Sequence, residues 1–354
     1  MAHPPVVAGI DFGGSKIAVA ICDLMGNRLA SGRVSTRAGV DVPPGPDGDG
    51  SPAGLDGAKV IFDRGVRATR ELLAAAAPDS ELAAVGVATF GIPAEDRVLL
   101  APAIDGWEAL ALGRELRAAF PGADIRMATD VKAAAAAEYR WGALRGCDPC
   151  VYLNLGTGLA AAIVAGGRVL SGDQGAAGEI GYNLRAIADV GLGLGQRVPL
   201  EDAVSGLGLA RQVSARGLAR EAGAGPLSAA DVFGASLDDP DLAGLADGFI
   251  AELAFHVVNL AICINPARIA VGGGMAGSWA QLQPDLERAL NAGAPFPPQL
   301  VLAEFPHEAP LIGAVALAVD AVQDQQHYPH AGPPAADLDG HRRPSPARLA
   351  GDCS

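Results

Sequence analysis

Two short glycine-rich segments carry side chains suited to binding phosphate. The first is Asp11-Phe-Gly-Gly-Ser-Lys16, and the second is Leu155-Gly-Thr-Gly158; each follows an apolar, strand-like run. Glycines let the backbone turn tightly and bring N–H donors against phosphate oxygens. The Asp11 carboxylate and the Ser15 and Thr157 hydroxyls can address a metal ion and the phosphates. Together these segments predict a protein that handles a nucleoside triphosphate.

Both segments are expected to lie in turns between strands. Apolar runs over 6–10 and 17–22 flank the first segment, and runs over 151–154 and 160–164 flank the second. This weak internal repeat predicts two related sheets that face a cleft. The spacing of apolar residues adds helices over 62–77, 133–144, 249–263 and 311–322, and strands over 82–89, 125–128 and 268–271.

Composition narrows the class of protein. The chain has 354 residues, of which 50% are hydrophobic, so it can form two domains of ordinary size. Its formal charge of -14 and its pI near 4.8 exclude nucleic acid as a main partner, since nucleic acid is also an anion. We find no run of about 18 uninterrupted apolar residues and no signal-peptide pattern, so we expect a cytoplasmic protein with no membrane partner.

The domain organisation follows from these runs. We expect an N-terminal α/β domain over residues 1–120, completed by the helix 311–322, and a C-terminal α/β domain over 121–310. A stretch over 39–57 is dense in Pro, Gly and Asp and is interpreted as an insertion. Residues 324–354 have few apolar side chains and are expected to form a disordered tail.

Cys147-Asp-Pro-Cys150 has a spacing that occurs in redox sites and in half of a zinc site. Two further zinc ligands do not appear nearby in the sequence, so a loop between a helix and a strand is the favoured interpretation. A redox role stays as a distant alternative.

Six motifs occur in an order that resembles the ROK family, whose members are mostly sugar kinases with some sugar-responsive repressors. Glycine turns taken singly are weak evidence, but their order over residues 6–322 is specific. The motifs are Asp11-x-Gly-Gly-Ser-Lys16, Gly91-x-Pro93, Asp130 at a strand-to-helix junction, Gly156-Thr-Gly158, Ala177-Gly-Glu-Ile-Gly181 and Asn265-Pro-x-x-Ile-x-x-Gly-Gly-Gly274.

The resemblance implies an α/β fold with two actin-like ATPase (ribonuclease H-like) domains flanking a catalytic cleft, and the use of ATP and Mg²⁺. Asp11 is expected to address Mg²⁺ through water, and Gly272, Gly273 and Gly274 to lie near the adenosine. The residues that match nucleotide-binding motifs are Asp11, Gly13, Gly14, Ser15, Lys16, Gly156, Thr157, Gly158, Gly272, Gly273 and Gly274.

Asp130 matches the family's catalytic aspartate. A carboxylate at this place can accept the proton of the acceptor hydroxyl during phosphoryl transfer. The residue types alone favour an N-cap of the following helix, and the two roles are compatible. By the same resemblance, the acceptor is expected to contact Asp130, Thr129, Glu179, Tyr182 and Glu201.

The chain departs from the family at its structural zinc site. Tyr182 stands in place of a histidine, and Leu192, Leu194 and Pro199 stand in place of three cysteines. A structural zinc needs four such ligands, so we predict that none is bound and that apolar packing of Leu192 and Leu194 replaces it.

The acceptor pocket also departs from the family. Thr129 and Ala103 replace asparagines, and Ala94 replaces a glycine. Lys132 is unusual for the family; it could touch substrate or phosphate, although a solvated lysine is the favoured interpretation.

The favoured function is phosphorylation of the primary hydroxyl of a hexose, and a hexose-like cyclitol is the alternative acceptor. A non-catalytic sugar sensor or repressor is less favoured, because the first strand begins by Val6 and leaves no room for an N-terminal helix-turn-helix. The resemblance also implies a homodimer.

Overall fold

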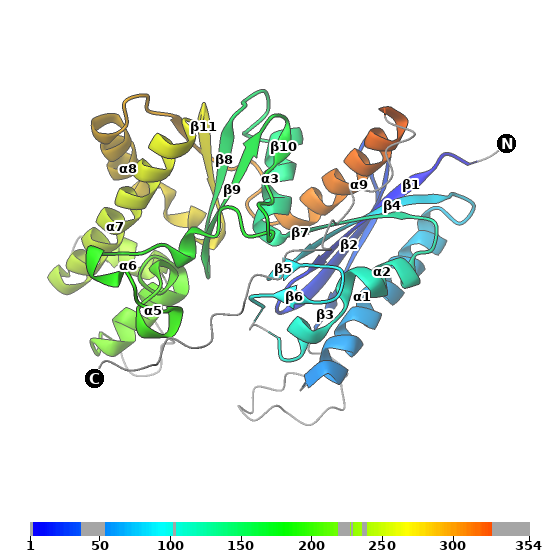
Figure 1. The fold of residues 1–354 in the computed structure, drawn as a ribbon, viewed down its shortest axis with the longest axis horizontal. Coiled ribbons are helices and arrows are strands. Elements are labelled where there is room, and N and C mark those ends of the chain that lie inside the picture. The colour runs from blue at the N-terminus through cyan, green and yellow to red at the C-terminus, as the bar shows by residue number, and fades with distance from the viewer. Residues whose placement is uncertain are drawn as a thin grey trace, which may run out of the picture.

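Two five-stranded sheets form the centres of two lobes (Figure 1). The computed structural model describes residues 3–36, 54–101, 104–218, 227, 229–235 and 239–327. The first sheet has the order β3-β2-β1-β4-β7, and the second has the order β10-β9-β8-β11-β12. The strands are β1 (Val6–Phe12), β2 (Lys16–Asp23), β3 (Arg28–Ser35), β4 (Leu82–Thr89), β7 (Asp124–Thr129), β8 (Cys150–Leu155), β9 (Leu159–Ala165), β10 (Arg168–Val169), β11 (Arg268–Gly272) and β12 (Gln299–Leu302).

The two sheets have the same topology, which confirms the predicted internal repeat. β1 pairs antiparallel with β2 and parallel with β4, and β8 pairs antiparallel with β9 and parallel with β11. β3 and β10 extend the antiparallel side, and β7 and β12 extend the parallel side. The β1–β2 and β8–β9 turns are therefore equivalent places in the two lobes, and they hold the two glycine-rich segments.

Helices cover both faces of the first sheet. On one face, α1 (Gly54–Ala76) and α2 (Leu112–Ala119) pack on side chains such as Ile10 of β1. On the other face, α9 (Ala309–His327) packs on Val7 of the same strand. Neighbouring residues of one strand thus enter different cores, which is why its sequence is a continuous apolar run.

The second sheet is covered in the same way. α3 (Asp130–Arg140) packs on one face. The core on the opposite face includes α7 (Pro240–Ile264) and α8 (Trp279–Gly293). The remaining helices of this lobe are α4 (Leu200–Ala203), α5 (Gly206–Ala215) and α6 (Ala229–Ala235). The short elements are β5 (Ile92–Pro93), β6 (Val98–Leu99) and the 3₁₀ helices η1 (Trp107–Ala109), η2 (Ile180–Tyr182), η3 (Ile187–Asp189), η4 (Leu194–Gln196) and η5 (Gly274–Ser278).

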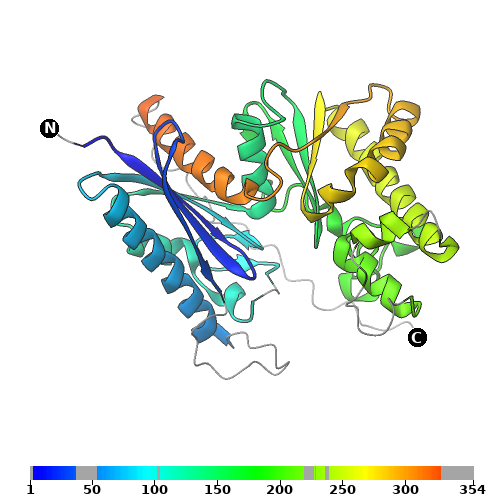
Figure 2. The ribbon, with the colours of Figure 1, turned by 180° about the vertical axis from the view of Figure 1, so that it is seen from behind.

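Helices α3 and α9 face each other between the lobes, as Figures 1 and 2 show from opposite sides. The contact is very close, because a Cβ on Gly313 of α9 would lie 1.7 Å from the carbonyl oxygen of Ala133 on α3. The chain passes between the sheets twice, from β7 to α3 and from β12 to α9. Both crossovers therefore lie on this helix pair.

The structure corrects the predicted domain boundary at residue 120. Residues 124–129 form β7, which pairs in parallel with β4 of the first sheet, whereas α3 packs on the second sheet. The short apolar run of β7 contains no signal of its partner strand. We propose a boundary between Thr129 and Asp130, with α9 completing the first domain.

The C-terminal helix is longer than predicted. It continues to His327, past the residue at which we expected the tail to begin. Within this extension, the carboxylate of Asp324 lies 3.7 Å from Arg126 of β7. The rest of the predicted tail, from residue 328, and most of the predicted insertion, residues 39–53, lie outside the described residues.

Within the described ranges, α7 alone is long and apolar enough to cross a membrane, as judged by length and composition. Its most apolar window has a mean hydropathy of 1.6. The same helix places Leu242, Leu253 and Val257 in the core of the second lobe. Length and composition alone do not separate such a core helix from a membrane-spanning one.

Candidate active site

Asp130 lies where the chain leaves the first sheet and enters α3. The Oγ1 atom of Thr129 accepts a hydrogen bond from the Lys132 N–H at 3.2 Å, so Thr129 is the N-cap of the helix. The N-cap interpretation of Asp130 is therefore wrong. The Oδ1 atom of Asp130 instead accepts from the Val131 N–H at 2.8 Å.

Asp11 and Asp130 lie at the same end of the first sheet, where the parallel strands β1 and β7 reach their carboxyl termini. The pairing aligns Asp11 of β1 with Ala88 of β4, and Ala88 with Ala128 of β7. Burial raises the pKa of Asp11 to about 7; the charge of Asp130 adds to the rise, and Lys16 opposes it. The Asp130 carboxylate, at the start of α3, therefore acts on the ionisation of Asp11 at the end of β1.

Burial also raises the pKa of Asp130, to about 6. The Val131 N–H and Lys132 lower this pKa, whereas the charge of Glu179 raises it further. Asp130 therefore loses its proton only as the pH approaches neutrality.

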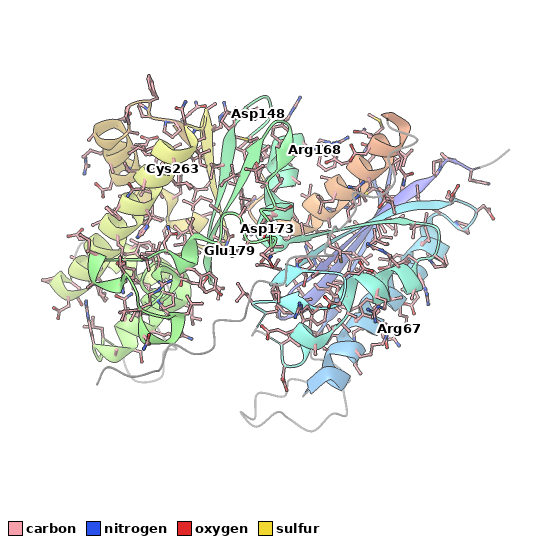
Figure 3. All side chains as sticks on the ribbon, viewed as in Figure 1. Arg67, Asp148, Arg168, Asp173, Glu179 and Cys263 are labelled. Carbon is pink, nitrogen blue, oxygen red and sulfur yellow. The ribbon has the colours of Figure 1, made fainter. Side chains whose placement is uncertain are left out.

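Lys132 and Glu179 form an ion pair beside Asp130. The Lys132 Nζ atom lies 3.5 Å from Glu179 Oε1, and the two side chains are 5% and 23% exposed. The favoured interpretation of Lys132 as a solvated lysine is therefore wrong. Burial raises the pKa of Glu179, Lys132 lowers it, and Glu201 raises it. Figure 3 shows Glu179 near the middle of the molecule, on the side of the second lobe that faces the first.

Glu201 connects this ion pair to the second glycine-rich segment. Its Oε2 atom accepts a hydrogen bond from the Leu159 N–H at 2.9 Å, and a Cβ on Gly158 would lie 2.4 Å from the same oxygen. Tyr182 lies beside the same carboxylates. Burial raises the pKa of its phenol, and Glu201, Glu179 and Glu108 raise it further.

Gly156 lies against the third glycine-rich segment, Gly272 to Gly274. A Cβ on Gly156 would lie 3.3 Å from the Gly274 N atom. Gly273 has a φ of 92°, and a Cβ there would lie 2.5 Å from the carbonyl oxygen of Leu155. Only glycine suits that conformation and that close approach. The predicted phosphate and adenosine segments of the second lobe are therefore adjacent, with Gly272 the last residue of β11.

The first glycine-rich turn is braced from within its own lobe. The Gly13 N–H donates to the carbonyl oxygen of Lys16 at 3.0 Å, and the Thr36 hydroxyl donates to that of Gly14 at 3.0 Å. The Thr36 N–H donates to the carbonyl oxygen of Ser15 at 3.2 Å. Gly14, Ser15 and Lys16 are exposed, so the turn presents its tip to solvent.

The structure thus joins the predicted site residues into a chain of neighbours. Asp130 is an electrostatic neighbour of Asp11 and Glu179, Glu179 is one of Glu201, and Glu201 touches Gly158. This chain runs from the first sheet, through the crossover, to the glycine-rich segment of the second lobe.

Three contributors were not predicted as site residues. Thr36 braces the first turn, Glu108 of η1 faces Tyr182 from the first lobe, and Lys132 is buried beside Glu179. In the sequence, the available indication of Glu108 was its position directly after a tryptophan, Trp107. The ring of Trp107 is fully buried. Ala103, a predicted difference in the pocket, lies outside the described residues, and Cys147 and Cys150 are free thiols.

The predicted apolar packing in place of the zinc site is wrong. Leu192 and Leu194 are 43% and 54% exposed. Glycines surround both residues, so no larger side chain in the segment covers them. In the part of the chain that the structure describes, no group of three or more His, Cys, Asp or Glu side chains is placed to hold a metal ion.

Arginines hold this segment instead. Arg197 donates to the carbonyl oxygens of Tyr182 and Asn183, at 2.6 and 3.1 Å. Arg185 pairs with Glu252 of α7, with Nη2 2.9 Å from Oε2. The Arg197 contacts tie the two ends of residues 182–199 to each other, and Arg185 ties the segment to α7.

Comparisons with known proteins agree with this architecture. A sequence model of the ROK family matches residues 66–321. Kanosamine kinase of Amycolatopsis mediterranei is 30% identical over 251 residues, which cover 67% of this chain and 77% of that protein. The bifunctional enzyme NanE/NanK of Brucella melitensis is 34% identical over 209 residues, and the chain spans only 37% of its length. The ROK glucokinase of Streptomyces griseus, solved with glucose and AMPPNP, superimposes with a TM-score of 0.64 at 26% identity, covering 89% of this chain and 99% of that one.

The duplicated sheet topology and these matches define a protein with the actin-like ATPase fold. Its carboxylates gather where the chain crosses between the two lobes. The chain belongs to the ROK family.

Proposed function

We propose that the chain is an ATP-dependent kinase that transfers the γ-phosphoryl group to the primary hydroxyl of a hexose. The observation that carries this proposal is the position of Asp130 at the crossover, beside Asp11 of the first lobe and the Lys132–Glu179 pair. The sugar-kinase names of the ROK relatives support it.

Asp130 is the proposed general base. Phosphoryl transfer needs little covalent chemistry from the protein, but the acceptor hydroxyl must be aimed and relieved of its proton. A base is most effective when its pKa lies near the working pH, and the pKa of Asp130 is raised to about 6. Glu179 and Glu201 would accept hydrogen bonds from acceptor hydroxyls, with Thr129 and Tyr182 bordering the same pocket.

The residues present fit ATP and Mg²⁺. The exposed turn at Gly14 and Ser15 and the backbones of Gly273 and Gly274 would hold the nucleotide through N–H groups. Gly13 and Gly156 would shape these turns, because their own N–H groups donate to the carbonyl oxygens of Lys16 and Gly158. The carboxylate oxygens of Asp11 are ligands that Mg²⁺ accepts, directly or through water, and a cation there would offset the repulsion between Asp11 and Asp130. When bound, ATP supplies the phosphoryl group and Mg²⁺ neutralises phosphate charge.

The acceptor class is tested by measuring ADP release with hexoses, N-acetylhexosamines and cyclitols. A hexose is the favoured acceptor; a hexose-like cyclitol is the alternative, because Thr129 and Ala94 change the pocket relative to the family. If the protein binds a sugar but releases no ADP with any acceptor of the panel, the result would instead indicate a sugar-sensing protein.

The role of Asp130 is tested by Asp130→Asn. We expect kcat to fall by about 10²–10⁴-fold while nucleotide binding persists. Asp124→Asn, at the opposite end of β7, is the matched control and should keep full activity. Turnover by Asp130→Asn equal to that of the unaltered enzyme would refute the proposed base.

We also propose a cytoplasmic homodimer that uses the outer face of α7. Phe255 and Ile262 of this helix are 59% and 48% exposed. If these side chains are buried between two copies, Phe255→Glu should give a monomer in light scattering. Phe296→Glu, which changes an even more exposed phenylalanine elsewhere, should leave the dimer intact. A dimer that persists in Phe255→Glu would exclude this face.

A further inference from the structure

Lys132 occupies a place that is unfavourable for a lysine. The sequence has three lysines; Lys16 is exposed and the Lys59 side chain is 43% exposed, whereas the Lys132 side chain is 5% exposed. Burying an ammonium costs free energy, and the first turn of a helix repels cations through the helix dipole. Helix α3 therefore gains nothing from this residue, so its placement needs another explanation.

The surroundings of Lys132 are those of the proposed acceptor pocket. Its Nζ atom lies 3.5 Å from Glu179 Oε1, and adding an ordinary hydrogen bond of about 2.8 Å limits any acceptor atom bound by that oxygen to about 6 Å from Nζ. At such distances in a partly buried site, two like charges repel by several kcal/mol at most and by about 1 kcal/mol at least. Lys132 is thus within electrostatic reach of whatever Glu179 binds.

Lys132 reverses the preference of the pocket between cationic and neutral acceptors. The pocket has three carboxylates in sequence: the charge of Glu201 acts on Glu179, and the charge of Glu179 acts on Asp130. Without an internal cation, they would favour an acceptor that carries an ammonium group. With Lys132 paired to Glu179, an acceptor ammonium at that carboxylate would meet the lysine.

We propose that Lys132 determines the charge class of the acceptor: the buried lysine, paired with Glu179 next to Asp130, excludes sugars that carry a free amino group and admits neutral ones. This inference rests on the proposed function, because it takes Glu179 as an acceptor contact. It adds a specificity-determining residue whose effect depends on charge rather than on shape.

The test compares neutral and cationic acceptors of nearly equal shape. The acceptors are D-glucose, N-acetyl-D-glucosamine, D-glucosamine and 3-amino-3-deoxy-D-glucose, at a pH where the amines are protonated. Dissociation constants are measured by calorimetry in the presence of AMPPNP, and kcat/KM is measured with ATP. We compare the unaltered chain with Lys132→Met, Lys132→Gln and Lys132→Arg, and with Lys59→Met as the surface control.

We expect the unaltered chain to bind D-glucose much more tightly than at least one of the two amino sugars. Lys132→Met and Lys132→Gln should reduce that preference by about tenfold or more, as expected for removal of one like charge at this range. Lys132→Arg, which keeps the charge, and Lys59→Met should retain the preference. The N-acetyl sugar, which carries no charge, should gain nothing from the loss of the lysine.

The outcomes separate this inference from the proposed function. A preference for D-glucose that is unchanged in folded Lys132→Met and Lys132→Gln overturns the role of Lys132, whatever the activity. An equal loss of affinity for all four sugars also overturns it, since that result indicates that Lys132 only positions Glu179. If no acceptor is phosphorylated but the binding preference shifts as expected, the proposed kinase function fails and the role of Lys132 stands.

Discussion

Glu138 offers the sharpest test of how the two lobes are joined. This residue of α3 is fully buried, and its carboxylate accepts three backbone hydrogen bonds. The donors are the N–H groups of Ala143 at 2.7 Å, Glu304 at 3.1 Å and Phe305 at 2.8 Å. Ala143 follows α3, and the other two residues lead from β12 to α9. One side chain therefore ties together both crossovers of the chain.

Replacing Glu138 by alanine would leave three partly buried N–H donors without their acceptor. Each such donor costs about 1–3 kcal/mol, and water entering the space left by the side chain recovers part of that cost. We therefore expect Glu138→Ala to lower the free energy of unfolding by about 4 kcal/mol. Glu138→Gln keeps one acceptor oxygen and should lose about half as much.

The assay is urea unfolding followed by circular dichroism and tryptophan fluorescence, with m-values compared because two lobes can unfold separately. Glu71→Ala, an exposed change on α1, is the control and should stay within about 0.5 kcal/mol. A loss below about 1 kcal/mol for Glu138→Ala, with an unchanged m-value, would refute this account of the crossover.

Four further predictions follow from other features of the structure. The value of kcat/KM should rise with pH through about 6, because the proposed base Asp130 must lose its proton, and burial raises its pKa from 3.8 to about 6. By linkage, a pKa raised by folding contributes stability at low pH, and this stability is lost as the pH rises through 4 to 6. Asp130→Asn should therefore raise Tm at pH 8 and not at pH 4. Equal shifts of Tm at both pH values would contradict this. Gly313→Ala should destabilise the protein strongly, because its Cβ would lie 1.7 Å from a carbonyl oxygen of α3, whereas Gly244→Ala on α7 meets nothing within 4 Å and should stabilise it by up to about 1 kcal/mol, with Tm as the readout. Treatment with EDTA should leave Tm unchanged and elemental analysis should find no zinc, since arginines hold residues 182–199; a lowered Tm that zinc restores would refute this.

Local sequence was sufficient for most of the secondary structure. The strand predicted over 82–89 is β4 to the residue, and the helix predicted over 249–263 lies within α7. Apolar periodicity is a property of neighbouring residues, so it survives in a single sequence. The partner of a strand cannot be predicted from neighbouring residues. The short run that forms β7 was therefore placed in the wrong lobe.

The site shows the same division. The residue types and the order of motifs indicated Asp11, Asp130 and the glycine-rich turns, because each motif is a short local pattern. The burial of Lys132 was not predicted, since an isolated lysine two residues into a helix gives no sign of what packs over it. The exposure of Leu192 was missed for the same reason.

Local patterns in the sequence were sufficient to find the duplicated strand pattern, and they predicted a phosphate-binding role for the glycine-rich turns and a role as general base for Asp130. Only the tertiary structure decided that Asp11 and Asp130 share one end of the first sheet, that Lys132 pairs with Glu179 and that Glu138 holds both crossovers. The physical reason is that periodicity and turn chemistry act over a few residues, whereas burial, electrostatic coupling and strand partnership arise from residues far apart in the chain.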